Sequence, residues 1–258
     1  MRPLTGDQVT FSREPDGTAV IRTIGPRSTL LERIDKRGRA EGIAANLSVL
    51  AVVIAPKPAP DWQLVDRYLV TSVIMGIDAI LIRNKLDIVD TDLDTRLADY
   101  GRIGYQVYKT NAKSREGTAA LAESLDNKRG VLVGQSGVGK SSLLNTLLAR
   151  DAQAVGSLSE GSSLGRHTTT ATVLYRLPQG GELIDSPGVR RYAPNISQLE
   201  DLQRGFVEFR ELLGQCRFND CRHRDEPDCA IQTAAKAGKI SPARYASYLN
   251  LCSTLAER

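Results

Sequence analysis

The chain has 258 residues, of which 41% are hydrophobic and 25% charged, and its 34 Lys and Arg against 30 Asp and Glu give a net charge of +4 at pH 7. This composition fits a folded protein of about two domains, with room for a small third module, and excludes a disordered chain. The sequence has no apolar run of about 18 residues and no apolar signal-peptide core near its start, so we expect a cytoplasmic protein without a membrane partner.

Residues 1–36 are predicted to form a small β module. Three apolar or β-branched runs, at 9–11, 19–21 and 29–31, are separated by turn residues at 15–17 and 25–26. Three strands are too few to close a barrel, so we expect this module to be incomplete.

Residues 37–195 alternate between strand and helix patterns. The continuous apolar run at 47–54 is typical of a strand buried on both faces. The alternation predicts an α/β fold, with a mostly parallel sheet and helices on both faces. Strands are predicted at 47–54, 79–82, 105–108, 130–133, 170–175 and 182–184, and helices at 61–75, 118–125 and 139–148.

Residues 134–141 match the pattern G-x-x-x-x-G-K-[ST] between an apolar strand and a helix. Its glycines allow consecutive backbone N–H groups to point at phosphate oxygens, at the positive end of a helix dipole. We expect Lys140 to reach the β- and γ-phosphates, Ser141 to bind Mg²⁺ and Ser142 to contact the α-phosphate. The pattern predicts a nucleoside triphosphate site without naming the base. Its cradle residues are Gly134, Gln135, Ser136, Gly137, Val138 and Gly139.

The segment 84–87 has the form N-K-x-D and follows a predicted strand. A carboxylate at Asp87 only accepts hydrogen bonds, which suits the two donors of guanine, N1–H and N2–H₂, and disfavours adenine. Asn84 is expected to contact the purine edge, and the stem of Lys85 to lie across the base plane. In the loop at 110–113, which contains Asn111, the Ala112 N–H is expected to donate to guanine O6.

Two further nucleotide elements follow the phosphate loop. The segment 165–170 offers a hydroxyl for Mg²⁺ from Thr168, Thr169 or Thr170. Asp185, in the D-x-x-G segment 185–188, is expected to hold Mg²⁺ through water, and the Gly188 N–H to sense the γ-phosphate. The base motif precedes the phosphate loop, so the order of the parts is permuted relative to most GTPases.

The catalytic group is the least defined part of the predicted site. Val189 follows Gly188, where many GTPases carry a Gln that orients water, so we expect slow intrinsic hydrolysis completed by a partner. His167 is the in-chain candidate for positioning water, together with Lys140 and Gly188. Alternatively, His167 contacts RNA or packs against its neighbours.

Residues 196–258 combine helical patterns at 199–213, 231–236 and 243–255 with a cysteine and histidine cluster. Three thiols and one imidazole make a closed ligand set that is typical of structural zinc. Buried, reduced cysteines are the alternative, and Cys252 lies in an apolar helix and is predicted to be core. The four candidate ligands are Cys216, Cys221, His223 and Cys229.

In this order, the motifs resemble those of circularly permuted GTPases, and the spacing of the C-terminal ligands makes the chain similar to the ribosome small subunit-dependent GTPase A family. The resemblance implies an OB-fold-like module at 1–36, a permuted G domain at 37–195 and a helical zinc-binding domain at 196–258. It also implies GTP hydrolysis to GDP, stimulated by the small ribosomal subunit and its rRNA during late maturation. The expected cofactors are one structural Zn²⁺ and Mg²⁺ with GTP, and we expect a monomer.

Three alternatives are weighed against this hypothesis. The first is an RNA-binding adaptor with a GTP-gated but slowly hydrolysing site, which the intact set of Lys140, Ser141 and Asp185 disfavours. The second is a P-loop kinase or ATPase, which Asp87 disfavours. The third is a permuted GTPase of the large subunit, a class that generally lacks such a zinc cluster.

Overall fold

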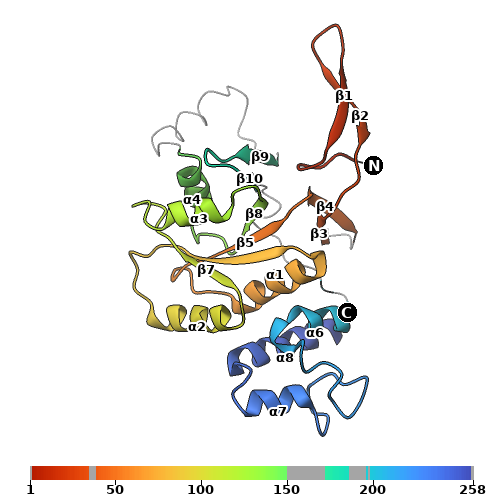
Figure 1. Cartoon of the computed structure of the whole chain (residues 1–258), viewed down its shortest axis with the longest axis vertical. Helices are drawn as coiled ribbons and strands as arrows, with labels where there is room; N and C mark the ends of the chain where they lie inside the picture. Colours follow the sequence, from red (N-terminus) through yellow and green to blue (C-terminus); the bar gives the residue numbers. More distant parts are fainter. Residues whose placement is uncertain (1, 35–38, 150–171, 186–195, 197, 257–258) are drawn as a thin grey trace.

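The computed structural model describes residues 2–34, 39–149, 172–185, 196 and 198–256. A central sheet has helices on both faces; one β-hairpin, β3–β4, lies beside it, a second, β1–β2, projects at one end of the molecule, and a small helical module lies at the other end (Figure 1). No helix in these ranges is both long and apolar enough to cross a membrane.

The central sheet has six strands in the order β7-β6-β5-β8-β10-β9. All neighbours pair in parallel except β9, which is antiparallel to β10. The predicted α/β class with a mostly parallel sheet is therefore confirmed. The strands are β5 (Val49–Ile54), β6 (Asp78–Arg83), β7 (Gln106–Lys109), β8 (Arg129–Val133), β9 (Val173–Arg176) and β10 (Glu182–Asp185).

The middle strand β5 divides the core of the sheet into two layers. All six of its residues are buried, and they alternate between the two faces. One set packs with α1 (Trp62–Met75) and α2 (Thr91–Arg102), and the other with α3 (Thr118–Ser124) and α4 (Lys140–Leu147). The first set is Leu50, Val52 and Ile54, and the second is Val49, Ala51 and Val53.

Two elements were not predicted from the sequence. Helix α2 buries only Leu93, Leu97 and Tyr100 on an otherwise polar surface, and begins after the cap Asp90, whose carboxylate accepts from the Leu93 N–H at 2.9 Å. Strand β4 (Ala40–Ala45) is rich in Ala and Gly, which have low strand propensity, and forms because it pairs with β3 (Leu30–Ile34).

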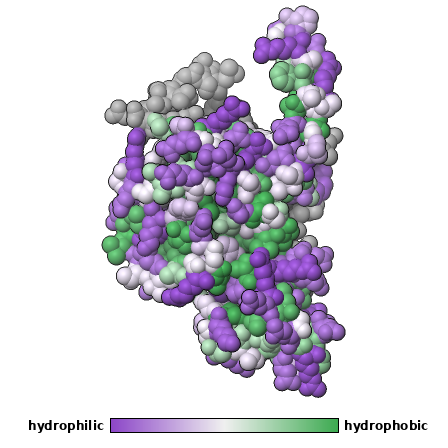
Figure 2. All heavy atoms as spheres, in the orientation of Figure 1, coloured by the Kyte–Doolittle hydropathy of each residue, from purple (hydrophilic) through white to green (hydrophobic). Residues whose placement is uncertain are grey.

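The N-terminal part contains two antiparallel hairpins, β3–β4 and the pair of β1 (Val9–Arg13) with β2 (Ala19–Ile24). The three strands predicted within residues 1–36 are present as β1, β2 and β3, and the unpredicted β4 follows that range. Val9, Phe11 and Ile21 of the β1–β2 hairpin are exposed, and hydrophobic surface is visible on this hairpin in Figure 2. The module boundary predicted at residue 36 lies between β3 and β4, and the domain division stays a prediction.

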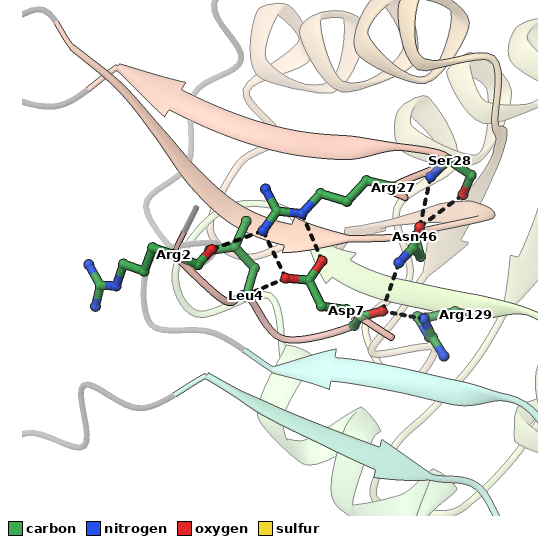
Figure 3. Close-up of polar contacts among 8 residues, drawn as sticks. Arg2, Leu4, Asp7, Arg27, Ser28, Asn46 and Arg129 are labelled. Carbon is green, nitrogen blue, oxygen red and sulfur yellow. Dashed lines mark hydrogen bonds and ion pairs between the residues drawn. The ribbon is translucent and has the colours of Figure 1, made fainter. Parts of the chain in front are cut away.

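A polar network fastens the N-terminal segment to the sheet (Figure 3). The guanidinium of Arg27 donates to both carboxylate oxygens of Asp7, at 2.7 and 2.8 Å. The carbonyl of Gly6 accepts from Asn46 at 3.0 Å and from Arg129 of β8 at 2.7 Å. Residues 4–7 therefore bind both the β3–β4 hairpin and the central sheet.

The C-terminal module has a core of its own. Phe206 and Tyr248 meet edge to face, with ring centroids 5.4 Å apart, and Phe209 packs against both. The helix predicted at 199–213 is interrupted at Phe206, where the backbone is extended. The elements are α6 (Leu199–Gly205), the 3₁₀ turn η2 (Val207–Phe209), α7 (Ala230–Lys236) and α8 (Pro242–Ala256).

Candidate nucleotide and metal sites

The predicted phosphate loop connects β8 to the first residue of α4. Gly134, Gly137 and Gly139 all have positive φ, which other residues adopt at a cost. A Cβ on Gly134 would lie 2.3 Å from the carbonyl oxygen of Val53, and one on Gly139 would lie 2.3 Å from the amide nitrogen of Asn84. The loop thus requires glycine for its backbone conformation and for its close contact with neighbouring segments.

Lys140, the first residue of α4, turns back over the loop. Its ammonium donates to the carbonyls of Gly134 at 2.7 Å and of Gln135 at 2.6 Å. Gln135 in turn accepts from the Asp61 N–H at 2.8 Å, at the start of α1. The phosphate loop is therefore held by its own Lys140 and by the start of helix α1.

Asn84 joins the base motif to the other two loops. Its amide donates to the carbonyl of Val138 at 2.9 Å, and its carbonyl oxygen accepts from the Ala112 N–H at 3.2 Å and the Thr110 hydroxyl at 3.3 Å. Asn84 is buried, and in this structure the Ala112 N–H is bound to it. The expected contacts of Asn84 and Ala112 with the base stay predictions.

Lys85 and Asp87 project from the same motif. The ammonium of Lys85 donates to the carbonyls of Gly137 and Lys57, both at 2.7 Å, so its stem crosses to the phosphate loop. One carboxylate oxygen of Asp87 accepts from the amide of Asn111 at 3.1 Å. The amide oxygen of Asn111 accepts from the Lys113 N–H at 2.9 Å, which holds that loop closed.

A cavity of about 510 Å³ brings the three loops together. Base-motif residues line one part of it and the start of α4 lines another, a size and chemistry that suit a nucleotide. Gly134, Gln135 and Val138 of the predicted cradle are not among the lining residues. The lining is formed by Asn84, Lys85, Asp87, Ile88, Asn111, Ala112, Lys113, Ser136, Gly137, Gly139, Lys140, Ser141 and Ser142.

Several predicted site residues lie outside the described residues: His167, Thr168, Thr169, Thr170 and Gly188. Asp185 is described, as the last residue of β10, which pairs with β8. Because β8 leads directly into the phosphate loop, Asp185 lies at the end of the strand next to the one that carries this loop.

The four predicted metal ligands converge in the C-terminal module. Their ligand atoms all lie within 4.8 Å of one another, and Nδ1 of His223 lies 3.5 Å from Sγ of Cys216 and 3.4 Å from Sγ of Cys229. Burial raises the pKa of Cys221 to about 12 and lowers the pKa of His223. A cation at the centre would supply the charge that a set of thiolates needs.

A neighbouring tyrosine holds the backbone of His223. The Tyr245 hydroxyl donates to the carbonyl of His223 at 2.8 Å, and His223 itself has a φ of 58°. Cys252 is buried in the module core and is not part of the four-residue group. The Cys₃His set can therefore hold a metal ion, as the spacing predicted.

The roles of two buried arginines near these sites were not predicted from the sequence. Arg83 lies next to the base motif, and its side chain is almost completely buried. Arg244 of α8 is also buried and binds Asp66 of α1. A charged residue within an apolar strand or helix was the available signal, but it does not reveal the partner.

Three comparisons place the chain among known proteins. A family model described as RsgA GTPase matches residues 24–194. The Small ribosomal subunit biogenesis GTPase RsgA of Chromohalobacter salexigens is 44% identical over 99% of this chain and 76% of its own length, and that of Azotobacter vinelandii is 45% identical over 98% and 75%.

Two solved structures are also similar to this chain. YjeQ from Thermotoga maritima matches with a TM-score of 0.79 and 30% identity, over 100% of this chain and 86% of that one. YloQ, described as a circularly permuted GTPase, matches with a TM-score of 0.75 and 29% identity, over 100% and 82%. With the motifs in permuted order around one cavity, these matches show that the chain belongs to the RsgA GTPase family.

Proposed function

We propose that this protein hydrolyses GTP to GDP and phosphate during late maturation of the small ribosomal subunit, which stimulates the reaction. The observation that carries the proposal is that one cavity is lined both by Asp87 of the base motif and by Lys140 and Ser141 of the phosphate loop. The names of the curated relatives supply the ribosomal context. The GTP-gated RNA-binding adaptor is the less favoured alternative.

The nucleotide would lie with its base at Asp87 and its phosphates over the phosphate loop. Asp87 accepts from N1–H and N2–H₂ of guanine, and Lys140 moves from the loop carbonyls to the phosphates. Ser141, Asp185 and one of the threonines at 168–170 would hold Mg²⁺, which neutralises phosphate charge. His167 would position the attacking water, with Lys140 and the Gly188 N–H at the γ-phosphate.

The metal of the C-terminal module is proposed to be one structural Zn²⁺. Bonds of about 2.3 Å to sulfur and about 2.0 Å to nitrogen place tetrahedral ligands about 3.8 Å apart for S to S and about 3.5 Å for S to N. Three of the six ligand separations match these values, at 3.8 Å between Sγ of Cys216 and Cys229, and 3.5 and 3.4 Å from these to Nδ1 of His223, and all four ligand atoms lie within 4.8 Å of one another. This agreement favours zinc over unbound, reduced cysteines.

The remaining expectations also belong to the proposal. The protein would act as a cytoplasmic monomer that contacts rRNA, with a β module, a permuted G domain and a zinc-binding module. The basic net charge of +4 is compatible with contact with phosphates but does not locate it.

The deciding experiment measures GTP turnover with purified small subunits, large subunits or neither. We expect slow turnover alone and strong stimulation by small subunits only. Stimulation by large subunits, or none at all, would contradict the proposed role, and displacement of GDP by equimolar ATP would contradict guanine specificity.

A matched pair of variants tests the zinc site. Cys221→Ser is expected to lower the zinc content well below one per chain, whereas Cys252→Ala, also at a buried cysteine, is expected to retain it. Equal zinc loss in both variants, measured by metal analysis of the purified protein, would argue against the four-residue site.

A further inference from the structure

Arg83 is an unusual residue for its position at the end of β6. Its side chain is 1% exposed, next to the apolar Leu81 and Ile82 and directly before Asn84 of the base motif. Burying a guanidinium is costly unless its donors and its charge are satisfied. The groups that satisfy Arg83 therefore indicate what it does.

The two Nη atoms of Arg83 bind the two ends of one turn. Nη1 donates to the carbonyl of Lys85 at 2.8 Å, and Nη2 to the carbonyl of Ile88 at 2.7 Å. The same turn is closed by the Ile88 N–H, which donates to the carbonyl of Lys85 at 3.0 Å. Asp87 is the third residue of this turn, so the guanidinium spans the segment that presents its carboxylate.

The turn needs such support because of its backbone. Lys85 has a φ of 62°, a left-handed conformation that a residue with a long side chain rarely adopts. The charge of Arg83 is balanced by an ion pair with Asp94 of α2, whose carboxylate lies 3.4 Å from Nε without forming a hydrogen bond. The guanidinium is thus fixed between α2 and the turn, and its planar fork is suited to binding two carbonyls at once.

We infer that Arg83 is a positioning residue for guanine specificity, acting through Asp87; this rests on the proposed GTPase function. Asn111 binds only one oxygen of the Asp87 carboxylate. Two parallel hydrogen bonds to N1–H and N2–H₂ require the carboxylate to keep one orientation, and Arg83 sets that orientation by holding the turn. Without Arg83, the Asp87 carboxylate can reorient and then accepts hydrogen bonds from fewer than both guanine donors.

The test compares GDP with IDP, whose base lacks the 2-amino group, by calorimetry on the full, zinc-loaded chain. In Arg83→Met we expect GDP affinity to fall by about tenfold or more, as for loss of a charge-assisted hydrogen bond. IDP affinity should fall less, so the GDP/IDP affinity ratio decreases. A general loss of protein stability would lower the affinities for GDP and IDP by the same factor and leave their ratio unchanged.

Two further variants complete the design. Arg102→Met removes an exposed arginine from α2, one that pairs with Asp99, and is expected to keep the wild-type ratio. Arg83→Lys can satisfy one carbonyl and is expected to give an intermediate ratio, and it decides the matter if Arg83→Met does not fold.

A wild-type ratio in a folded Arg83→Met or Arg83→Lys variant would overturn the inference. If the wild-type protein itself binds no GDP, the proposed function fails instead, so the two failures are distinguishable.

Discussion

Replacing Arg244 with Met should destabilise the protein strongly, because this residue joins the C-terminal module to the central domain. Its guanidinium binds Asp66 of α1 and donates to both carboxylate oxygens of Glu208, at 2.7 and 3.0 Å. Arg244 is 2% exposed, and the side chains of Asp66 and Glu208 are 0% and 6% exposed. Its removal leaves two buried carboxylates without their cation.

Breaking a buried ion pair by removing one partner costs about 3–5 kcal/mol, and we expect Arg244→Met to lower the free energy of unfolding by about that much. The single tryptophan reports on this interface, since Trp62 stacks on Tyr100 at 5.8 Å and the Tyr100 hydroxyl donates to Asp66 at 2.7 Å. Urea unfolding followed by tryptophan fluorescence therefore measures the effect directly.

The matched control is Arg102→Met, which removes an exposed pair within α2 and should cost less than about 1 kcal/mol. Adding Glu208→Gln to Arg244→Met should recover part of the loss, because it neutralises one of the stranded carboxylates. Equal destabilisation by Arg244→Met and Arg102→Met would refute the view that the buried network joins the two parts.

Three further changes are expected to act on single contacts. Asp87→Asn presents an amide donor to guanine and should weaken GDP binding by about 100-fold. The same variant should bind XDP more tightly than the wild type does, because the C2 carbonyl of xanthine accepts from that amide, and calorimetry measures both affinities. Gly139→Ala places a Cβ 2.3 Å from an amide nitrogen and should abolish GDP binding, whereas Gly238→Ala, also at positive φ but in open space, should not. The hydrogen bonds from Arg27 lower the pKa of Asp7 below its ordinary 3.8, so the pair stabilises the fold above that pH and the effect fades as pH falls through the lowered pKa. The melting temperature of Asp7→Asn should therefore lie below that of the wild type at pH 7, and the difference should shrink as the pH is lowered below 3.8.

Local patterns predicted the elements that carry the nucleotide loops. Strand β5 follows from its run of apolar residues, and the loop before α4 follows from its glycines. Both signals lie within a few residues of sequence, and both elements were predicted. Strand β4 and helix α2 were missed because pairing with β3 and burial of three side chains decide them.

The site shows the same division between local and long-range information. Asp87, Lys140 and the four metal ligands follow from residue type and spacing. The fork of Arg83 depends on how a turn folds back on its own strand, and Asp66, one of the partners of Arg244, lies 178 residues away from it in sequence. Spacing in the chain contains no information on such contacts, so only the folded structure reveals them.

Helix α1 contacts both the phosphate loop and the C-terminal module. The N–H of Asp61, the residue that caps this helix, donates to Gln135 of the phosphate loop, and Asp66 binds the C-terminal module. Near the middle of the helix, Val70 packs so closely on α6 that a Cβ on Gly205 would lie 2.4 Å from it. The module is therefore attached to α1 as well as through the chain that follows residue 185. A rotation of the module against the sheet would have to break the buried Arg244 network, whereas a movement that it shares with α1 would leave that network intact.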